Sequence, residues 1–219
     1  MRFSIDIGGT FTDLILEDDN GRLWLEKSPT TPDDPVQGVL DVLEAAAGTM
    51  RMPCREMLAR GECLIHATTR ALNAVLTHTT ARTAFLTTKG HPDVLLMREG
   101  GRERFNYVQP YPDPCVPRSL TFEVPERIGS QGEVVLPMDE GATIEIIRKL
   151  AEKRVEAVAV CLLWSIVAPG HELRLGELLD RHLPGVPYTL SHQLNPAMRE
   201  YRRASSAASR ASASCTLNR

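Results

Sequence analysis

The stretch Asp-Ile-Gly-Gly-Thr-Phe-Thr-Asp, residues 6–13, decides the fold class. The residues before it alternate between apolar and polar, which predicts a β-strand over residues 2–7. The same alternation resumes directly after the two glycines, so a second strand is predicted over residues 11–16. A dinucleotide-binding glycine turn would open a helix at this point instead. The segment therefore predicts a strand-turn-strand unit.

The rest of the chain predicts an α/β protein. Residues 18–21 form a hairpin-turn signal that leads to a third strand over residues 22–27, and Asp34 with Pro35 marks a helix start. Further predicted elements are helices over 69–76, 141–153 and 171–182, strands over 63–66, 83–87, 157–163 and 188–190, a hairpin over 120–136, and loops over 90–114 and 191–196. Three antiparallel strands followed by alternating helices and strands predict a mixed sheet of the ribonuclease-H-like kind that actin-like ATPases use.

The overall composition excludes several classes of protein. The 219 residues carry a formal net charge of -3, so no global field favours nucleic acid or an anionic membrane. No apolar run reaches the roughly 18 residues of a membrane span. The five cysteines are odd in number and lack CxxC spacing, which indicates neither a disulfide framework nor a zinc site. A cytoplasmic protein is predicted.

The glycine turn has the residue types of a phosphate site. Gly8 and Gly9 allow a tight turn and present no side chain that would block a phosphate. Exposed backbone amides in such a turn form an anion-binding concavity, to which the hydroxyls of Thr10 and Thr12 add donors. Asp6, at the end of the first strand, is predicted to hold Mg²⁺ through water. The alternative is a plain hairpin in which the glycines serve geometry alone.

Two further sets of polar residues allow more than one interpretation. Asp13 either bonds the turn backbone, acts in the site or is simply exposed. His66, Thr68 and Thr69 lie where a strand leads into a helix, a common location for ligand-binding groups in open α/β sheets. Helix capping by the threonines beside a partly buried histidine is the alternative.

Three other polar groups have simpler interpretations. His171-Glu172 is interpreted as the start of a helix. The charged loop over residues 98–104 is interpreted as solvated, with a substrate-loop role as the alternative. Ser191-His192 does not indicate a catalytic triad, because nothing in the sequence fixes its geometry.

Several segments together resemble one known family. Residues 5–13 resemble the opening of hydantoinase A/5-oxoprolinase proteins. Residues 66–75, His-Ala-Thr-Thr-Arg-Ala-Leu-Asn-Ala-Val, are similar to the family's His-Gly-Thr-Thr-x-Ala-x-Asn-Ala run. Matches continue through residues 81–95 and 124–128, and the resemblance covers residues 3–203 in order. It implies an actin-like ATPase architecture for a domain over residues 1–203.

The resemblance also implies an activity. Members of the family use ATP with Mg²⁺, through a proposed phosphorylated intermediate, to open cyclic amides such as 5-oxoproline or a hydantoin, together with a hydantoinase B-type partner subunit. It implies that His66, Thr68, Thr69 and Asn73 line the catalytic cleft. Related enzymes carboxylate ketones such as acetone or acetophenone. A subunit of a ketone carboxylase is therefore one alternative, and an inactive fragment that only binds a partner subunit is another.

Two departures from the family pattern stand out. Ala67 occupies a position where the family usually has glycine. Family chains also continue for several hundred residues, whereas residues 204–219 here are rich in Ala, Ser and Arg. This low-complexity tail is predicted to be poorly ordered, and we interpret it as the product of a frameshift or truncation. The second phosphate loop of an actin-like ATPase is then expected outside this chain.

Overall fold

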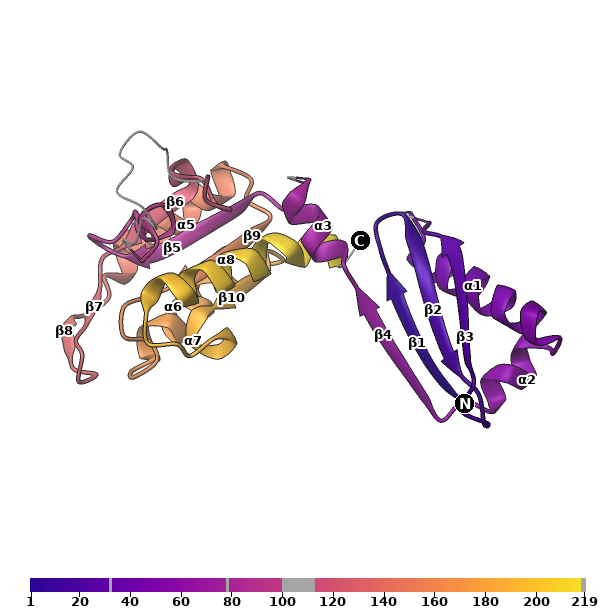
Figure 1. Cartoon of the computed structure of the whole chain (residues 1–219). Coiled ribbons are helices and arrows are strands. Elements are labelled where there is room, and N and C mark those ends of the chain that lie inside the picture. Colours follow the sequence, from indigo (N-terminus) through magenta and orange to yellow (C-terminus); the bar gives the residue numbers. More distant parts are fainter. Residues whose placement is uncertain (32, 78, 100–112, 218–219) are drawn as a thin grey trace, which may run out of the picture. The chain divides into compact units, whose positions relative to one another are not determined.

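The computed structural model describes residues 1–31, 33–77, 79–99 and 113–217. These residues form two compact units, Met1–Leu76 and Thr77–Arg219, where the sequence predicted one domain ending at residue 203 (Figure 1). Each unit has its own apolar core. In the described part of the chain, no helix is both long and apolar enough to cross a bilayer.

Unit 1 is built on a mixed four-stranded sheet, sheet A. Its strands are β1 (Arg2–Ile7), β2 (Phe11–Glu17), β3 (Leu23–Pro29) and β4 (Cys63–Thr68), in the order β3-β2-β1-β4. The first three strands are antiparallel, and β4 lies parallel to β1. The predicted strand-turn-strand unit, with a third antiparallel strand beside it, is therefore confirmed.

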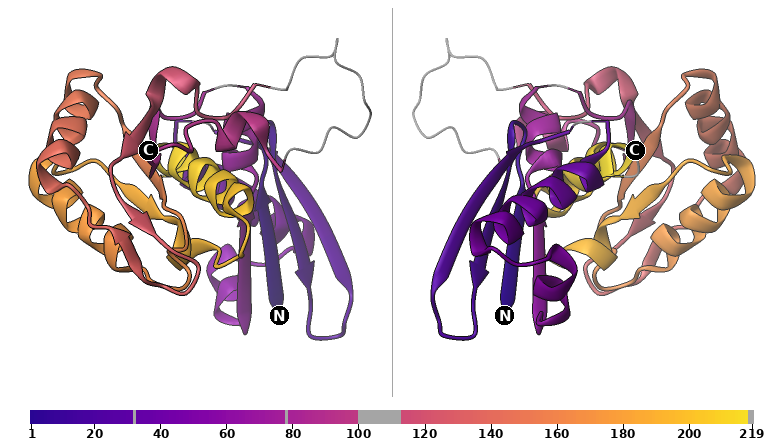
Figure 2. Two further views of the ribbon diagram at one scale, coloured as in Figure 1. Left: turned by 90° about the vertical axis from the view of Figure 1, so that its left-hand side faces the viewer. Right: turned by 90° about the vertical axis from the view of Figure 1, so that its right-hand side faces the viewer.

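Two helices cover one face of sheet A, α1 (Pro35–Met50) and α2 (Cys54–Ala59) (Figure 2). The side chain of Asp34 accepts hydrogen bonds from the amides of Val36 and Gln37, so the predicted helix start is confirmed. A third helix, α3 (Arg70–Leu76), follows β4. The apolar side chains of β1 and β2 pack under α1 and α2, and the residues of this core are Met1, Phe3, Ile5, Ile7, Leu14, Leu16, Val42, Leu43, Ala46, Ala47 and Met57.

Unit 2 is built on a parallel sheet, sheet B. Its strands are β5 (Thr83–Thr88), β6 (Thr121–Val124), β9 (Ala157–Cys161) and β10 (Tyr188–Leu190), in the order β10-β9-β5-β6. All three strand pairs are parallel. Every residue of β5 and β9 is buried, as expected for a parallel sheet covered on both faces.

Helices form the outer layers of unit 2. Helices α5 (Glu140–Glu152) and α6 (Gly170–His182) lie on one face of sheet B, and α8 (Glu200–Leu217) lies on the other (Figure 2). The remaining elements are the short helices α4 (Val94–Met97), η1 (Arg118–Leu120) and α7 (Ser191–Leu194), and the strands β7 (Arg127–Ile128) and β8 (Val134–Leu136).

Two predicted elements of unit 2 differ from the structure. The hairpin predicted over residues 120–136 is shorter, because β6 pairs in parallel with β5 and only β7 pairs with β8. The loop predicted over residues 191–196 begins with helix α7. Of the predicted loop over residues 90–114, residues 100–112 lie outside the described residues, which leaves part of the charged segment over residues 98–104 unassigned.

The tail from Ala204 was predicted to be poorly ordered, and that prediction is wrong as far as Leu217. Helix α8 buries Ala204, Ala207, Ala208 and Ala211 against sheet B. Their spacing of three and four residues places four methyl groups on one helix face. Alanine has the highest helix propensity, and its small side chain lets the helix approach β9 closely. The amino-acid composition of the tail does not reveal this helical spacing of its alanines.

Candidate functional site

The turn between β1 and β2 is closed by its own backbone. The amide of Gly8 donates to the carbonyl of Phe11 at 2.9 Å. A Cβ on Gly8 would stand 2.9 Å from that same carbonyl oxygen, closer than real side chains approach. Neither Gly8 nor Gly9 has a positive φ. At Gly8 glycine is required because there is no space for a side chain, and not because of the backbone conformation.

Helix α3 borders the turn on a second side. A Cβ on Gly9 would stand 2.8 Å from the side-chain nitrogen of Asn73. Asn73 Nδ2 lies 3.5 Å from Thr69 Oγ1, and the amide of Thr69 donates to the carbonyl of Ile7 at 3.1 Å. The structure therefore brings Thr69 and Asn73, both predicted site residues, directly beside the glycine turn.

Thr30, which immediately follows β3 and which the sequence analysis missed, supports the turn through two hydrogen bonds. Its amide donates to the carbonyl of Thr10 at 2.9 Å, and its hydroxyl donates to the carbonyl of Gly8 at 3.1 Å. The amides of Gly9 and Thr10 donate to no acceptor within the residues described. Thr30 thus occupies the carbonyls of Gly8 and Thr10, whereas the amides of Gly9 and Thr10 remain as donors for a ligand.

Thr12 has a structural position instead of a ligand-facing one. Its side chain is fully buried, and its hydroxyl lies 3.2 Å from the hydroxyl of Thr30. A Cβ on Gly38 of α1 would stand 3.2 Å from the same oxygen of Thr12. Thr12 thus supports Thr30 and the approach of α1, whereas Thr10 is exposed at the turn.

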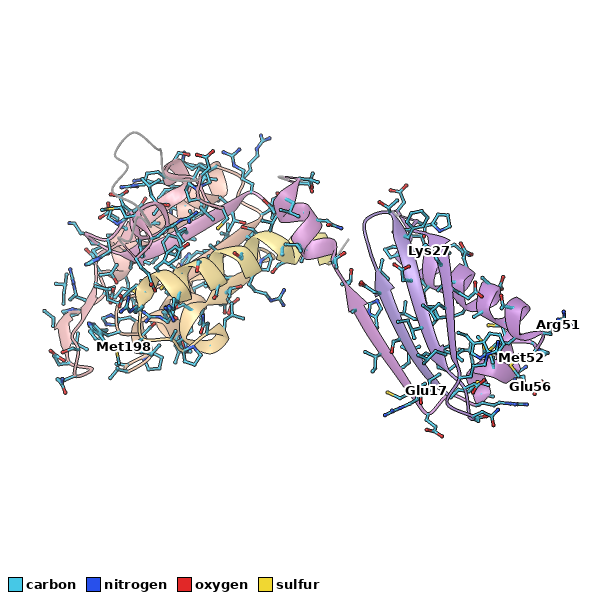
Figure 3. All side chains as sticks on the ribbon, viewed as in Figure 1. Glu17, Lys27, Arg51, Met52, Glu56 and Met198 are labelled. Atoms are coloured by element: carbon cyan, nitrogen blue, oxygen red, sulfur yellow. The ribbon has the colours of Figure 1, made fainter. Side chains whose placement is uncertain are left out.

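Two carboxylates stand next to the turn on the face of sheet A opposite α1 and α2. Asp6 and Asp13 are paired across β1 and β2, so their side chains leave the same face of the sheet. Asp6 is exposed, and Asp13 forms an ion pair with Lys27 at 3.1 Å. Lys27 lies at the turn end of the sheet, opposite the end that carries Glu17 (Figure 3). Asp6 is therefore the carboxylate that is available to a cation.

His66 is not brought together with Asp6. In the parallel pairing of β1 with β4, His66 stands opposite Ile5 and Ala67 stands opposite Asp6. Since successive residues of a strand point to opposite faces, His66 and Asp6 lie on different faces of sheet A. Thr68 donates through its hydroxyl to the carbonyl of Ile7 at 3.2 Å, which joins β4 to the end of β1.

Among residues 1–31, 33–77, 79–99 and 113–217, no three His, Cys, Asp or Glu side chains converge on a point that could hold a metal ion. A site for Mg²⁺ needs no such cluster, because this ion is commonly held by one or two carboxylates together with substrate phosphates and water.

Unit 2 contains two buried glutamate-histidine pairs that sequence reasoning missed. Glu172 is fully buried and accepts hydrogen bonds from the Leu162 amide at 2.8 Å, the Ser191 hydroxyl at 2.7 Å and His192 Nδ1 at 2.6 Å. Burial alone would raise the pKa of Glu172, but the bonds from His192, Leu162 and Ser191 outweigh it and hold the pKa below its usual value. The hydroxyl of Ser191 donates to Glu172 and not to the ring of His192, which is not the hydrogen-bond order of a catalytic triad.

The second pair joins Glu126 to His171. Glu126 is 1% exposed, its carboxylate lies 2.7 Å from His171 Nδ1, and it also accepts from the hydroxyl of Thr88. Thr88 Oγ1 in turn accepts from the amide of Leu163 at 2.9 Å. His171-Glu172 was interpreted as helix-start chemistry. Both residues do lie in the first turn of α6. In addition, His171 bonds Glu126, which follows β6, and Glu172 bonds the segments that follow β9 and β10.

Comparison with known proteins assigns the family. Residues 2–183 match the hydantoinase/oxoprolinase N-terminal region. The chain is 38% identical to the acetophenone carboxylase gamma subunit of Aromatoleum aromaticum, over 91% of this chain and 29% of that protein. It is 37% identical to the caprolactamase subunit alpha of Pseudomonas jessenii, over 93% of this chain and 30% of that protein.

A solved structure supports the same assignment. The crystal structure of the ATP-dependent caprolactamase from Pseudomonas jessenii superposes with a TM-score of 0.87 at 35% identity, and covers 100% of this chain and 32% of that one. The predicted α/β class with a mixed sheet is confirmed. The chain spans about a third or less of the length of these relatives. It belongs to the hydantoinase/oxoprolinase family, in which it corresponds to the N-terminal region.

Proposed function

We propose that this chain is the N-terminal part of an ATP-dependent enzyme that opens cyclic amides, and that the glycine turn of sheet A binds the phosphates of ATP. The observation that carries the proposal is the pair of amides at Gly9 and Thr10, which have no acceptor among the described residues and lie beside the exposed carboxylate of Asp6. Backbone amides in such a turn are suited to a polyphosphate.

Each residue near the turn has a proposed role. Gly9 and Thr10 donate to phosphate oxygens, while Thr30 holds the turn carbonyls away from the ligand. Asn73 of α3 and Thr69, which immediately precedes α3, border the turn, and their polar side chains orient the terminal phosphate. Thr12 and Thr68 keep the frame in place through their hydroxyl contacts.

Asp6 fits the role of a magnesium ligand. It is an exposed carboxylate at the strand end next to the turn, and the neighbouring Asp13 is already engaged by Lys27. A bound Mg²⁺ would neutralise charge on the phosphates during phosphoryl transfer. An unstrained amide resists hydrolysis, and activation by ATP supplies the leaving group that it lacks. Glu17 stands on the same face at the far end of β2 and serves as a control position.

A second candidate function is a subunit of an ATP-dependent ketone carboxylase. The specific observation in its favour is the 38% sequence identity to the acetophenone carboxylase gamma subunit. The identity to the caprolactamase subunit alpha is nearly the same, at 37%. For either function we propose a partner subunit of the hydantoinase B type. We further infer a cytoplasmic location, in keeping with the free cysteines Cys54, Cys63, Cys115 and Cys161.

A nucleotide titration tests the proposal. The wild-type chain, Asp6→Asn and Glu17→Gln are titrated with MgATP at constant ionic strength, and binding is followed by calorimetry. We expect Asp6→Asn to weaken binding about tenfold, since a water-mediated contact of a carboxylate with Mg²⁺ is worth about 1.4 kcal/mol. Glu17→Gln should bind as the wild type does. Equal affinity in all three proteins would refute the magnesium role of Asp6.

The reaction class is tested on the enzyme with its full-length chain and partner subunit. Turnover of 5-oxoproline, hydantoin or caprolactam with release of phosphate would support the amidase assignment. Fixation of labelled hydrogen carbonate onto acetone or acetophenone, without lactam turnover, would support the carboxylase instead. Absence of both activities, with MgATP binding retained, would restrict the conclusion to a nucleotide-binding subunit.

A further inference from the structure

The order of strands in sheet B creates a topological switch point between β5 and β9. The chain leaves β5 toward β6 on one side, and it leaves β9 toward β10 on the other. In open parallel sheets the carboxyl ends of two such neighbouring strands flank a ligand-binding crevice. Because β6 is parallel to β5, the segments that follow β5 and β6 lie at this same carboxyl edge of sheet B.

A tight turn follows β5 at this edge. The amide of His91 donates to the carbonyl of Thr88 at 3.1 Å, and Gly90 adopts a φ of +92°, which favours glycine. The amide of Lys89 donates to the Val124 carbonyl at 2.9 Å, and the amide of Gly90 donates to a carboxylate oxygen of Glu123 at 2.7 Å. The turn is thereby fixed to the end of β6.

The half-buried Arg127 lies beside this turn. Its Nη1 lies 3.3 Å from Nε2 of His91, and a Cβ on Gly90 would stand 4.0 Å from its Nη2. Within the ranges that the structure describes, the guanidinium takes part in no ion pair. By contrast, Arg118 pairs with Asp93, and the half-buried Arg174 pairs with Glu140.

The two glutamates near Arg127 in the sequence, Glu123 and Glu126, bond other groups. Glu123 accepts from the Gly90 amide and lies 3.8 Å from a guanidinium nitrogen of Arg118. Glu126 is turned inward to Thr88 and His171. A guanidinium has five N–H donors in a planar fork that matches two oxygens of one anion, and the contact with His91 uses one of them.

We propose that Arg127 and His91, with the Gly90 turn, form a binding site for a small oxyanion, either a carboxylate or a phosphate group. The guanidinium of Arg127 would bind two oxygens of the anion, and the absence of a side chain at Gly90 would leave room beside it. All residues of this site belong to unit 2, so the proposal does not depend on nucleotide binding at the glycine turn of sheet A.

The test measures anion binding by the whole chain. Sodium acetate and sodium phosphate are titrated separately, with chloride keeping the ionic strength constant, and the amide resonances of Gly90 and His91 are followed by NMR. Wild-type protein is compared with Arg127→Gln and His91→Gln. Arg82→Gln is the matched control, because Arg82 is exposed and immediately precedes β5, so the same charge is lost at the opposite end of that strand.

Saturable shifts at Gly90 and His91 are expected with at least one of the two anions, and the tighter binder identifies the source as carboxylate or phosphate. Arg127→Gln should weaken this binding about tenfold or more, His91→Gln should weaken it less, and Arg82→Gln should leave it unchanged. No saturable binding of either anion, or equal binding by wild type and Arg127→Gln, would overturn the proposal. Shifts at Gly9 and Thr10 report the glycine turn separately, so the two sites are distinguishable.

Discussion

The side-chain nitrogen of Asn73 lies 2.8 Å from the position that a Cβ on Gly9 would occupy. This relationship ties helix α3 to the turn between β1 and β2, so two segments more than sixty residues apart meet at one point. The two glycines of the pair are constrained differently. Gly8 is constrained by the backbone of its own turn, and Gly9 is constrained by a side chain of α3.

The two glycines are expected to respond differently to alanine. In Gly8→Ala the new methyl meets the Phe11 carbonyl, which cannot move without opening the turn, so the free energy of unfolding should fall by about 1–3 kcal/mol. In Gly9→Ala the neighbour is the end of the Asn73 side chain, which can rotate away. Urea unfolding of both variants measures the difference. Equal losses would contradict the separate constraints drawn here.

Thr30 is expected to stabilise unit 1 through its hydroxyl. Thr30→Val removes the bond to the Gly8 carbonyl and the contact with Thr12, which should cost about 1–2 kcal/mol of unfolding free energy. Thr10→Val, at the exposed position of the same turn, should change stability by less than about 0.5 kcal/mol. Denaturant midpoints compare the two directly. A loss at Thr10 as large as that at Thr30 would reverse their assigned roles.

The buried Glu172 makes the stability of unit 2 depend on pH. Its pKa is held below the usual value of 4.5, so the ionised form stabilises the fold above that pH. The stability is lost as the pH falls below 4.5 and through the lower pKa of the folded state. Glu172→Gln should show a shallower acid dependence in urea unfolding between about pH 5 and pH 3. Glu145→Gln, at an exposed position on α5, should keep the wild-type slope.

Helix α8 is expected to be an integral part of unit 2. Ala207 is fully buried against sheet B, so Ala207→Leu should overpack the core and cost about 1–3 kcal/mol. Arg210→Leu, on the exposed face of the same helix, is the control. Hydrogen exchange should also show protected amides over residues 204–213. Rapid exchange throughout that range would restore the prediction of a disordered tail.

The sequence predicted the parts of the fold in which local patterns and tertiary packing agree. The alternation on either side of Gly8 and Gly9 was enough to predict β1 and β2, and Asp34 with Pro35 was enough to predict the start of α1. The site was predicted less completely. Contacts such as that of Thr30 with Gly8 depend on the register between β2 and β3, which a single sequence does not specify residue by residue.

The failures have equally specific causes. His66 stands opposite Ile5 and not opposite Asp6, and no sequence pattern specified this alignment, because a shift of one residue exchanges the two faces of a strand. The helix over residues 200–217 was hidden because alanine and serine are typical of low-complexity segments, although four of its buried alanines recur at helical spacing. The partners of Glu126 and Glu172 lie far along the chain, where no sequence pattern pairs them.

The most direct measurement for the central claim is a ¹H–¹⁵N NMR titration of the chain with MgATP, read at every assigned amide. If the turn between β1 and β2 holds the phosphates, the resonances of Gly9 and Thr10 shift most and saturate together, and Asp6→Asn moves the midpoint to higher MgATP concentration. If those two amides stay unshifted while binding saturates elsewhere, the turn is not the phosphate site and the account of its geometry is wrong.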